Sequence, residues 1–399
     1  MKRTRRLIEK LVESLLTLSG ATTTLIIVLI SIFLFKEGFG LFNSPVVEKG
    51  YVVCLNSDNP VEQLSSFEIK EIFDEEITNW EKVGGTNEAI HPFRFEQLFD
   101  TYTEADFGED YELLPNKIIE LVKSDPQIIA FMPEKYVPEH LSIKVLPYQT
   151  FSATDFFLGK EWMPTATPTA QFGILPLVIG TLLISIVAIL IALPLGLGVA
   201  IYLSQLAGKR TRKLLKPVIE LLAGIPSVVY GFFGLVVLVP IVQDWLNLPV
   251  GETAFTGSLL LAIMALPTII TVAEDSMSNT PRAMQEASLA LGATHWQTIY
   301  KVIIPYAKSG ISAAVVLGIG RAIGETMAVL MVTGNAAVMP TSLFQPIRSI
   351  PATIAAELGE APAGGAHYQS LFLLGCILFL ITLVISITAE LISKRHPQN

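Results

Sequence analysis

Two side chains of opposite charge stand in a long apolar stretch of the sequence. Arg321 and Glu325 are the only charged residues between positions 309 and 333. A charge near the centre of a bilayer costs roughly 2.5 to 3.5 kcal/mol on insertion scales, so such residues face the interior of a helical bundle or a wet cavity. An anion site on a transport path is the functional interpretation, and a structural ion pair that locks two helices is the alternative.

The element that must position this pair is predicted to be one membrane helix over residues 309 to 333. On a continuous helix Arg321 and Glu325 would share a face, because positions four residues apart are neighbours. Gly320 and Gly324 form a G-x-x-x-G step, which allows a neighbouring helix to approach closely. We therefore expect both charges to point into a helical bundle.

A polar segment precedes this helix and has its own pattern. It runs from Glu286-Ala287-Ser288 to Gly292 and is followed, about ten residues later, by Val302-Ile303-Ile304-Pro305. This order resembles the EAA loop of ABC-importer permeases. The resemblance implies that Glu286, Ala287 and Gly292 lie on a cytoplasmic coupling helix at about residues 280 to 297, which occupies a groove of a separate ATPase. Glycine at 292 would permit a turn that strains other residues.

The composition indicates a membrane protein with one soluble, acidic part. The chain has 399 residues, of which 51% are hydrophobic, and a mean hydropathy of +0.55. Residues 46 to 160 hold 22 acidic and 9 basic residues, which gives this part a net charge of −13. Because the whole chain has a net charge of −9, the remainder carries +4. A chain of 399 residues with such a mean hydropathy is too apolar to be a soluble protein, so membrane spans are expected.

Six apolar runs are each long enough, or nearly so, for the ~20 residues that a bilayer needs. They lie at about residues 18–35, 173–203, 221–242, 255–272, 309–333 and 370–389. Basic residues gather at positions 2–10, 209–216 and 394–395, and all three clusters fall on one side if the spans alternate. The positive-inside rule then predicts cytoplasmic termini and places residues 36 to about 170 outside a bacterial inner membrane.

The predicted fold class is an α-helical membrane protein with six transmembrane helices of the ABC-importer permease type. Residues 1–45 would form the N-terminus and first helix, residues 46–155 an extracytoplasmic α/β insert between helices 1 and 2, and residues 156–399 a five-helix permease core. Within the insert, residues 51–55 and 128–132 have strand patterns, and residues 66–73 and 116–124 have helical ones.

The insert also resembles part of the solute-binding proteins of phosphate importers. The resemblance rests on Asn59-Pro60-Val61, on residues 65–85 and on Ser124-Asp125-Pro126 with the apolar run to Pro133. The S-G-T stretch that those proteins use to hold phosphate is missing after Arg94, where carboxylates stand instead. With about half the usual length, the insert would supply one lobe, and docking or gating is favoured over ligand binding.

Three further stretches, with residues 318–327, resemble the permease subunits of phosphate ABC importers. They are Glu161-Trp162-Met163-Pro164, residues 172–198 and residues 220–231. The resemblance covers most of residues 160 to 335 and implies that Arg321 and Glu325 serve phosphate passage. It also implies a second permease subunit, a dimer of ATP-binding subunits and an extracytoplasmic phosphate-binding protein as partners.

The sequence argues against chemistry catalysed by this chain. No G-x-x-x-x-G-K-[ST] pattern occurs, so ATP hydrolysis is expected on another subunit. No catalytic residues, metal ligands or cofactor are predicted. A permease for another oxyanion, such as sulfate or molybdate, remains an alternative, as does a membrane receptor that uses the insert as a sensor, although the segment from about residue 273 to 308 contains no transmitter domain.

Overall fold

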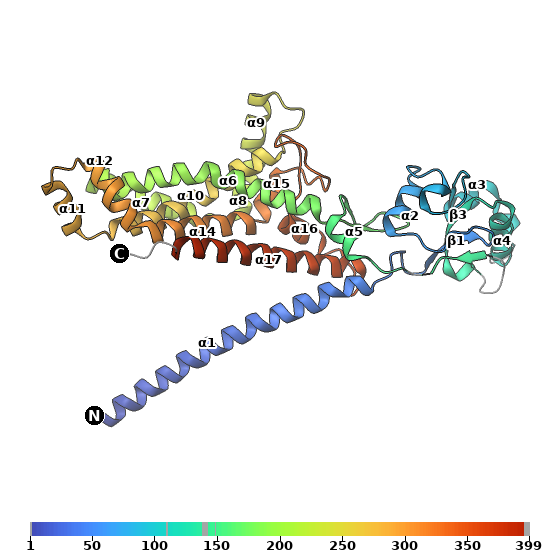
Figure 1. The fold of residues 1–399 in the computed structure, drawn as a ribbon, viewed down its shortest axis with the longest axis horizontal. Helices are drawn as coiled ribbons and strands as arrows, with labels where there is room; N and C mark the ends of the chain where they lie inside the picture. Colours follow the sequence, from blue (N-terminus) through green and yellow to red (C-terminus); the bar gives the residue numbers. More distant parts are fainter. Residues whose placement is uncertain (1, 109–110, 138–142, 148, 395–399) are drawn as a thin grey trace. The chain divides into compact units, whose positions relative to one another are not determined.

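The computed structural model describes residues 2–108, 111–137, 143–147 and 149–394. The chain divides into two compact units (Figure 1). The first comprises Met1–Ile174 and Ala361–Leu373, and the second comprises Leu175–Glu360 and Leu374–Asn399. Arg395, part of the last basic cluster in the sequence, lies outside the described residues.

The first unit contains a four-stranded sheet in the order β2-β3-β1-β4. Its strands are β1 (Tyr51–Asn56), β2 (His91–Arg94), β3 (Ile128–Pro133) and β4 (Ile143–Val145). β1 is antiparallel to both β3 and β4, whereas β2 is parallel to β3. The strand patterns read at residues 51–55 and 128–132 correspond to the two central strands.

Helices cover both faces of this sheet, because alternate residues of a strand point to opposite sides. Val53 and Phe131 pack with α2 (Ser66–Phe73) on one face. Cys54 and Met132 pack with α4 (Leu114–Ser124) on the other. Burial on both faces explains why β1 and β3 are almost continuously apolar.

A capping box starts α2: the Ser65 hydroxyl accepts from the Glu68 N–H, and the Glu68 carboxylate accepts from the Ser65 N–H. The compact unit continues past residue 155 through α5 (Ala153–Leu158), β5 (Trp162–Met163) and β6 (Gln171–Phe172). The hydroxyl of Thr169 donates to the Ser66 carbonyl at 2.9 Å, and Gln171 Nε2 donates to the same oxygen at 3.2 Å. These buried bonds attach the later segment to the insert.

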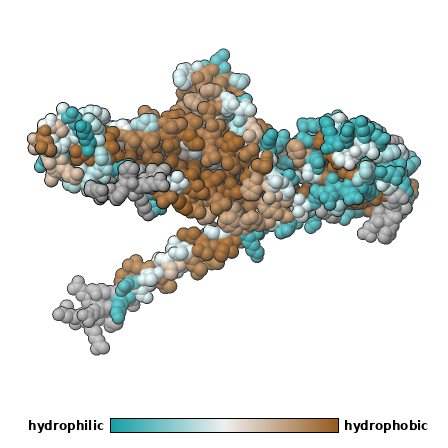
Figure 2. Space-filling view, viewed as in Figure 1, coloured by the Kyte–Doolittle hydropathy of each residue, from teal (hydrophilic) through white to brown (hydrophobic). Residues whose placement is uncertain are grey.

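Five of the described helices are long and apolar enough to cross a membrane, and a bent pair brings the number up to six. The five candidate spans are Val12–Asn43, Leu175–Leu206, Ser227–Leu246, Ala254–Ser278 and Ala366–Thr388. The bent pair is His295–Tyr306 with Lys308–Gly324, which meet at 71°. Figure 2 shows the brown, apolar surface of the helical unit and the teal, polar surface of the insert.

α10 (Ala254–Ser278) is central to the packing of the helical unit. It lies against α6 (Leu175–Ile201) and α14 (Lys308–Gly324), and its buried side chains supply much of the apolar core (Figure 1). Small residues allow the close approach: a Cβ on Gly318 of α14 would lie 2.9 Å from the Ile269 side chain of α10. α17 (Ala366–Lys394) is the last long helix in the chain.

Two predicted spans are interrupted in the structure. The span predicted at residues 221–242 begins only at Ser227. α7 (Lys209–Ala223) ends before Gly224-Ile225-Pro226, and a new helix, α8 (Ser227–Phe233), follows these three residues. α9 (Val239–Leu246) follows after a π-helical turn. The span read at residues 309–333 is also not continuous, since α14 ends at Gly324 and α15 (Met327–Val332) begins three residues later.

The loop before α17 carries a short helix, α16 (Ile350–Glu357), which is capped by the Ser349 hydroxyl. Its first turn is buried. The Ile350 N–H donates to Thr181 Oγ1 of α6 at 2.9 Å, which anchors the helix within the second unit.

Candidate functional site

Arg321 and Glu325 occupy different elements, which corrects the expectation that they share a helix face. Arg321 lies in the last turn of α14. Glu325 follows the helix end with φ −73° and ψ 132°, an extended conformation. Among the residues that the structure describes, no ion pair joins the two side chains. Glycine in the last helical position weakens the helix there, because glycine has a low helix propensity.

Each of the two charges has a separate partner. Arg321 is half-buried, and its Nη1 lies 3.4 Å from the hydroxyl oxygen of Thr268 on α10. Glu325 Oε1 accepts from the Ala328 N–H, in the first turn of α15, at 3.3 Å. A carboxylate at a helix N-terminus is favoured by the free N–H groups there. The guanidinium therefore keeps donors that no carboxylate occupies.

The two glycines of the G-x-x-x-G step do not pack against another element of the described part of this chain. A Cβ added to Gly320 or Gly324 would meet nothing within 4 Å, and both glycines are exposed. The small residues that pack within this chain are instead Ala314, Gly318 and Ala322, which are buried. Gly320 and Gly324 thus leave one side of α14 open near Arg321.

This arrangement has the donors that an anion needs. Arg321 presents planar N–H donors that match an oxyanion in a bidentate way, within a mainly apolar unit where such a charge interacts strongly. In the described part of the chain, no group of three histidine, cysteine, aspartate or glutamate side chains could hold a metal ion. The site is thus suited to recognition.

The predicted coupling segment forms two helices joined by a turn, so the single helix expected over residues 280–297 is wrong. α11 (Arg282–Ala290) carries Glu286 and Ala287, both exposed. Gly292 has φ +87°, in the left-handed region that glycine adopts without strain. α12 (His295–Thr298) then begins with a capping box formed by Thr294 and Gln297.

Side-chain contacts hold the two short helices together. The hydroxyls of Ser288 on α11 and Thr298 on α12 lie 2.9 Å apart. Around the turn, Leu291 is 89% exposed and Trp296 is 59% exposed. Sequence reasoning missed these two side chains, although apolar residues flanking a glycine in a polar loop are a readable sign of a docking surface.

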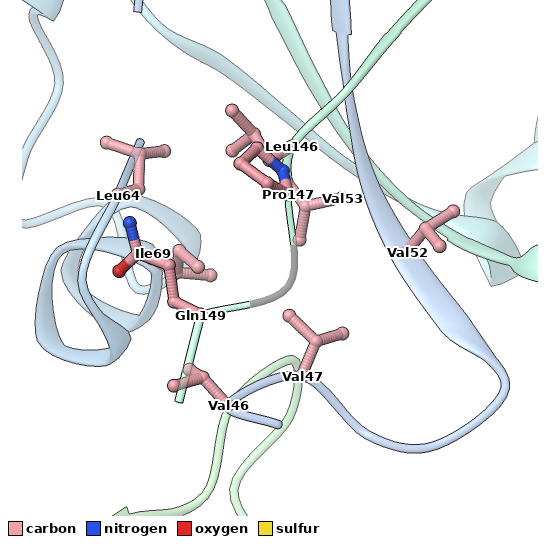
Figure 3. A pocket seen from close by; sticks show the side chains of 9 residues that line it. All are labelled: Val46, Val47, Val52, Val53, Leu64, Ile69, Leu146, Pro147 and Gln149. Atoms are coloured by element: carbon pink, nitrogen blue, oxygen red, sulfur yellow. The ribbon is translucent and has the colours of Figure 1, made fainter. Parts of the chain in front are cut away.

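A pocket in the insert has a lining that does not suit an anion (Figure 3). Its walls are aliphatic side chains and one amide, from Val46, Val47, Val52, Val53, Leu64, Ile69, Leu146, Pro147 and Gln149. Arg94, the only arginine between residues 46 and 160, is engaged elsewhere. Its Nη1 donates to the carbonyl and hydroxyl oxygens of Thr167 at 3.0 and 3.1 Å, and its guanidinium lies 5.2 Å from the centre of the Phe73 ring.

Comparison with known proteins gives several relatives of this chain. The probable ABC transporter permease protein YqgH of Bacillus subtilis is 39% identical over 61% of this chain and 79% of its own length. The phosphate transport system permease protein PstC of Mesorhizobium japonicum is 40% identical over 60% of this chain and 78% of its own length. A structure of the MetNI methionine ABC transporter is 17% identical, with a TM-score of 0.44 over 55% of this chain and 96% of that chain.

A family model covers the region that holds both sites. The model for the binding-protein-dependent transport system inner membrane component matches residues 192–396, which is just over half of the chain and includes α10, α11, α14 and α15. The apolar helices of the second unit agree with a protein of the membrane. The chain belongs to the binding-protein-dependent transport system inner membrane components and is a permease of the ABC-importer type.

Proposed function

We propose that this chain is a transmembrane permease subunit of an ATP-driven phosphate importer. The observation that carries the proposal is the half-buried Arg321 at the end of α14, which forms no ion pair with a carboxylate of the described residues. Supporting it, relatives with 34 to 40% identity include several phosphate transport system permeases, of which this chain covers 78 to 82%.

In this proposal Arg321 binds phosphate as it passes through the membrane. A guanidinium donates two parallel N–H bonds to an oxyanion, and Thr268 orients it from α10. Glu325 lies just beyond the helix end and is held at the start of α15 by the Ala328 N–H. Its negative charge opposes tight retention of the anion, so release can follow binding.

A second permease subunit completes the path. The open side of α14 at Gly320 and Gly324, where an added Cβ would meet nothing, supports a close approach by a helix from that subunit. Leu317, on the same helix, is 52% exposed and adds apolar area. Lipid-exposed glycines would serve no purpose there, whereas a helix–helix contact uses them.

The turn between α11 and α12 couples the permease to a separate ATPase dimer. Glu286 and Ala287 are exposed on α11, and Gly292 sets the turn through its positive φ. Leu291 and Trp296 offer apolar contacts at its tip. A polar loop with such an exposed apolar tip fits a protein surface better than a lipid one.

The insert is extracytoplasmic and docks a soluble phosphate-binding protein, whereas both chain termini are cytoplasmic. The basic residues at positions 2–10 and 209–216 support this orientation through the positive-inside rule. The engagement of Arg94 by Thr167 and the aliphatic pocket favour docking over phosphate binding by the insert.

Transport by a reconstituted complex tests the proposal. The chain, produced with its partner subunits in proteoliposomes, should take up labelled phosphate only when ATP and the binding protein are supplied. Excess unlabelled phosphate should compete, whereas sulfate and molybdate should not. Uptake inhibited equally by sulfate or molybdate would assign another oxyanion, and failure to copurify any ATP-binding subunit would favour the receptor alternative.

A further inference from the structure

A buried carboxylate lies near the C-terminal end of α10 and is not part of the anion site. The side chain of Glu274 is 1% exposed, and both of its oxygens are paired. Arg212 of α7 forms an ion pair with Oε1, and Lys216 Nζ lies 2.7 Å from Oε2. The Ser278 hydroxyl donates to Oε1 at 3.0 Å, so Glu274 is fully surrounded by donors.

Electrostatics makes α7 and α10 depend on each other at this point. Arg212 and Lys216 are four residues apart on α7, where like charges repel. Glu274 lies between them and offsets that repulsion, and the two cations offset the desolvation of its carboxylate. Loss of the Glu274 charge would leave two neighbouring cations without their shared partner, so α7 would separate more easily from α10.

The Glu274 cluster is linked on one side to the coupling segment and on the other side, through α7, to α8. Ser278 is the last residue of α10, and α11 begins only four positions later, at Arg282. On the other side, α7 leads through its C-terminal break into α8. The Tyr230 hydroxyl of α8 donates to the Leu222 carbonyl at 2.9 Å, which bridges this break.

α8 continues the sequence of contacts to α15. A Cβ added to Gly231 of α8 would lie 3.0 Å from Ala328 Cα of α15. Ala328 is the residue whose N–H holds Glu325. Elements joined by the chain or by packing therefore run from α11 through the Glu274 cluster, α7 and α8 to the start of α15.

We infer that Glu274 is a positioning residue that makes α7 and α10 move as one body. Displacement of the coupling segment by the ATPase then reaches α8 and α15 beside the anion site. The inference rests on the proposed coupling of α11 and α12 to an ATPase. Coupling free energies between distant sites typically change affinity by roughly 5- to 150-fold.

Neutralising Glu274 is expected to lower phosphate uptake without stopping ATP hydrolysis. In the reconstituted complex, Glu274→Gln should lower ATP-driven uptake by about tenfold, within the range typical of coupling between sites, while at least about half of the ATPase rate remains. The matched control is Asp275→Asn. Asp275 contacts the same Lys216 Nζ at 2.7 Å, but its side chain is 55% exposed, so uptake should stay near the unsubstituted level.

A second variant covers the case in which Glu274→Gln does not assemble. The double substitution Lys216→Gln and Glu274→Gln removes one charge of each sign and leaves only the partly exposed Arg212. It should assemble, hydrolyse ATP and transport poorly. A normal ratio of uptake to hydrolysis in either variant would overturn the inference, as would parallel loss of both activities in a fully assembled complex.

A distance measurement decides the inference even if phosphate is not the substrate. Spin labels at the exposed positions Lys213 on α7 and Asn279 after α10 are introduced in a background without Cys54 and Cys376. Their separation should stay constant when ATP binds the native complex and should change with Glu274→Gln. An ATP-dependent change already present with Glu274, or none in the variant, would contradict movement as one body. Failure of phosphate uptake by the unsubstituted complex would instead count against the proposed function.

Discussion

The guanidinium of Arg321 faces a hydroxyl, not a carboxylate: its Nη1 lies 3.4 Å from Thr268 Oγ1. The oppositely charged Glu325, four residues later, is held by the Ala328 N–H beyond the end of α14. An internal ion pair would have satisfied most of the guanidinium donors. Their separation leaves Arg321 able to receive an anion, and the proposed path depends on this feature.

Thr268 is expected to tune phosphate affinity by orienting Arg321. Thr268→Val keeps the shape of the side chain and removes the hydroxyl. The contact is long, so its loss should cost about 1 kcal/mol, which corresponds to roughly a fivefold rise in the KM for uptake. Thr271→Val, on the same half-buried helix one turn later, is the control. An unchanged KM in Thr268→Val would remove the orienting role.

Gly292 is expected to be needed for its backbone conformation. Gly292→Val places a β-branched residue at φ +87° and should uncouple ATP hydrolysis from uptake while the protein stays in the membrane. Gly292→Asn is the comparison, because asparagine tolerates the left-handed region. Uptake should fall strongly with valine and only modestly with asparagine. Equal effects of the two residues would point to the side chain, not the turn.

The insert is expected to be dispensable for membrane insertion but not for delivery of phosphate. Because Thr169 and Gln171 bond to the Ser66 carbonyl and β6 pairs with β5, the deletion should extend from residue 47 to residue 172 and be closed by a flexible linker. Copurification with the ATPase should persist, whereas capture of the binding protein and uptake should be lost. Full uptake by the shortened chain would show that docking lies elsewhere.

Cys54 is expected to resist alkylation as long as the insert is folded. Burial raises the pKa of its thiol to about 12, so the protonated form dominates at neutral pH. Relative to an ordinary cysteine, its thiolate fraction at pH 8 should be lower by about a thousandfold. With Cys376→Ser as background, maleimide should label Cys54 only after denaturation. Rapid labelling under native conditions would mean that the two-sided sheet core opens readily.

Long apolar helices and short apolar strands were predictable from the sequence, because residues buried on all sides must be apolar. The run read at residues 173–203 corresponds to α6, Leu175–Ile201, and the strand read at residues 51–55 to β1, Tyr51–Asn56. The turn at Gly292 was also foreseen and has the expected positive φ. These features depend on residues close together in the chain.

The helix end before Glu325 and the Glu274 cluster were not predictable in the same way. Gly324 can either pack a helix or end it, and the G-x-x-x-G pattern favoured packing. Only the structure shows that no described residue lies within 4 Å of the place a Cβ would take at Gly324. The two cations that pair with Glu274 lie 58 and 62 positions away in the sequence, so no local sequence pattern predicts these ion pairs.

The most direct test of the central claim is uptake by the chain with exchanged charges, Arg321→Glu together with Glu325→Arg. The exchange conserves net charge, but it moves the guanidinium past the end of α14 and away from Thr268. Copurification of the ATPase and amount in the membrane provide the control for assembly. If Arg321 binds the passing anion, ATP-driven phosphate uptake should collapse while assembly persists. Normal phosphate uptake by an assembled, charge-exchanged complex would contradict the role assigned to Arg321.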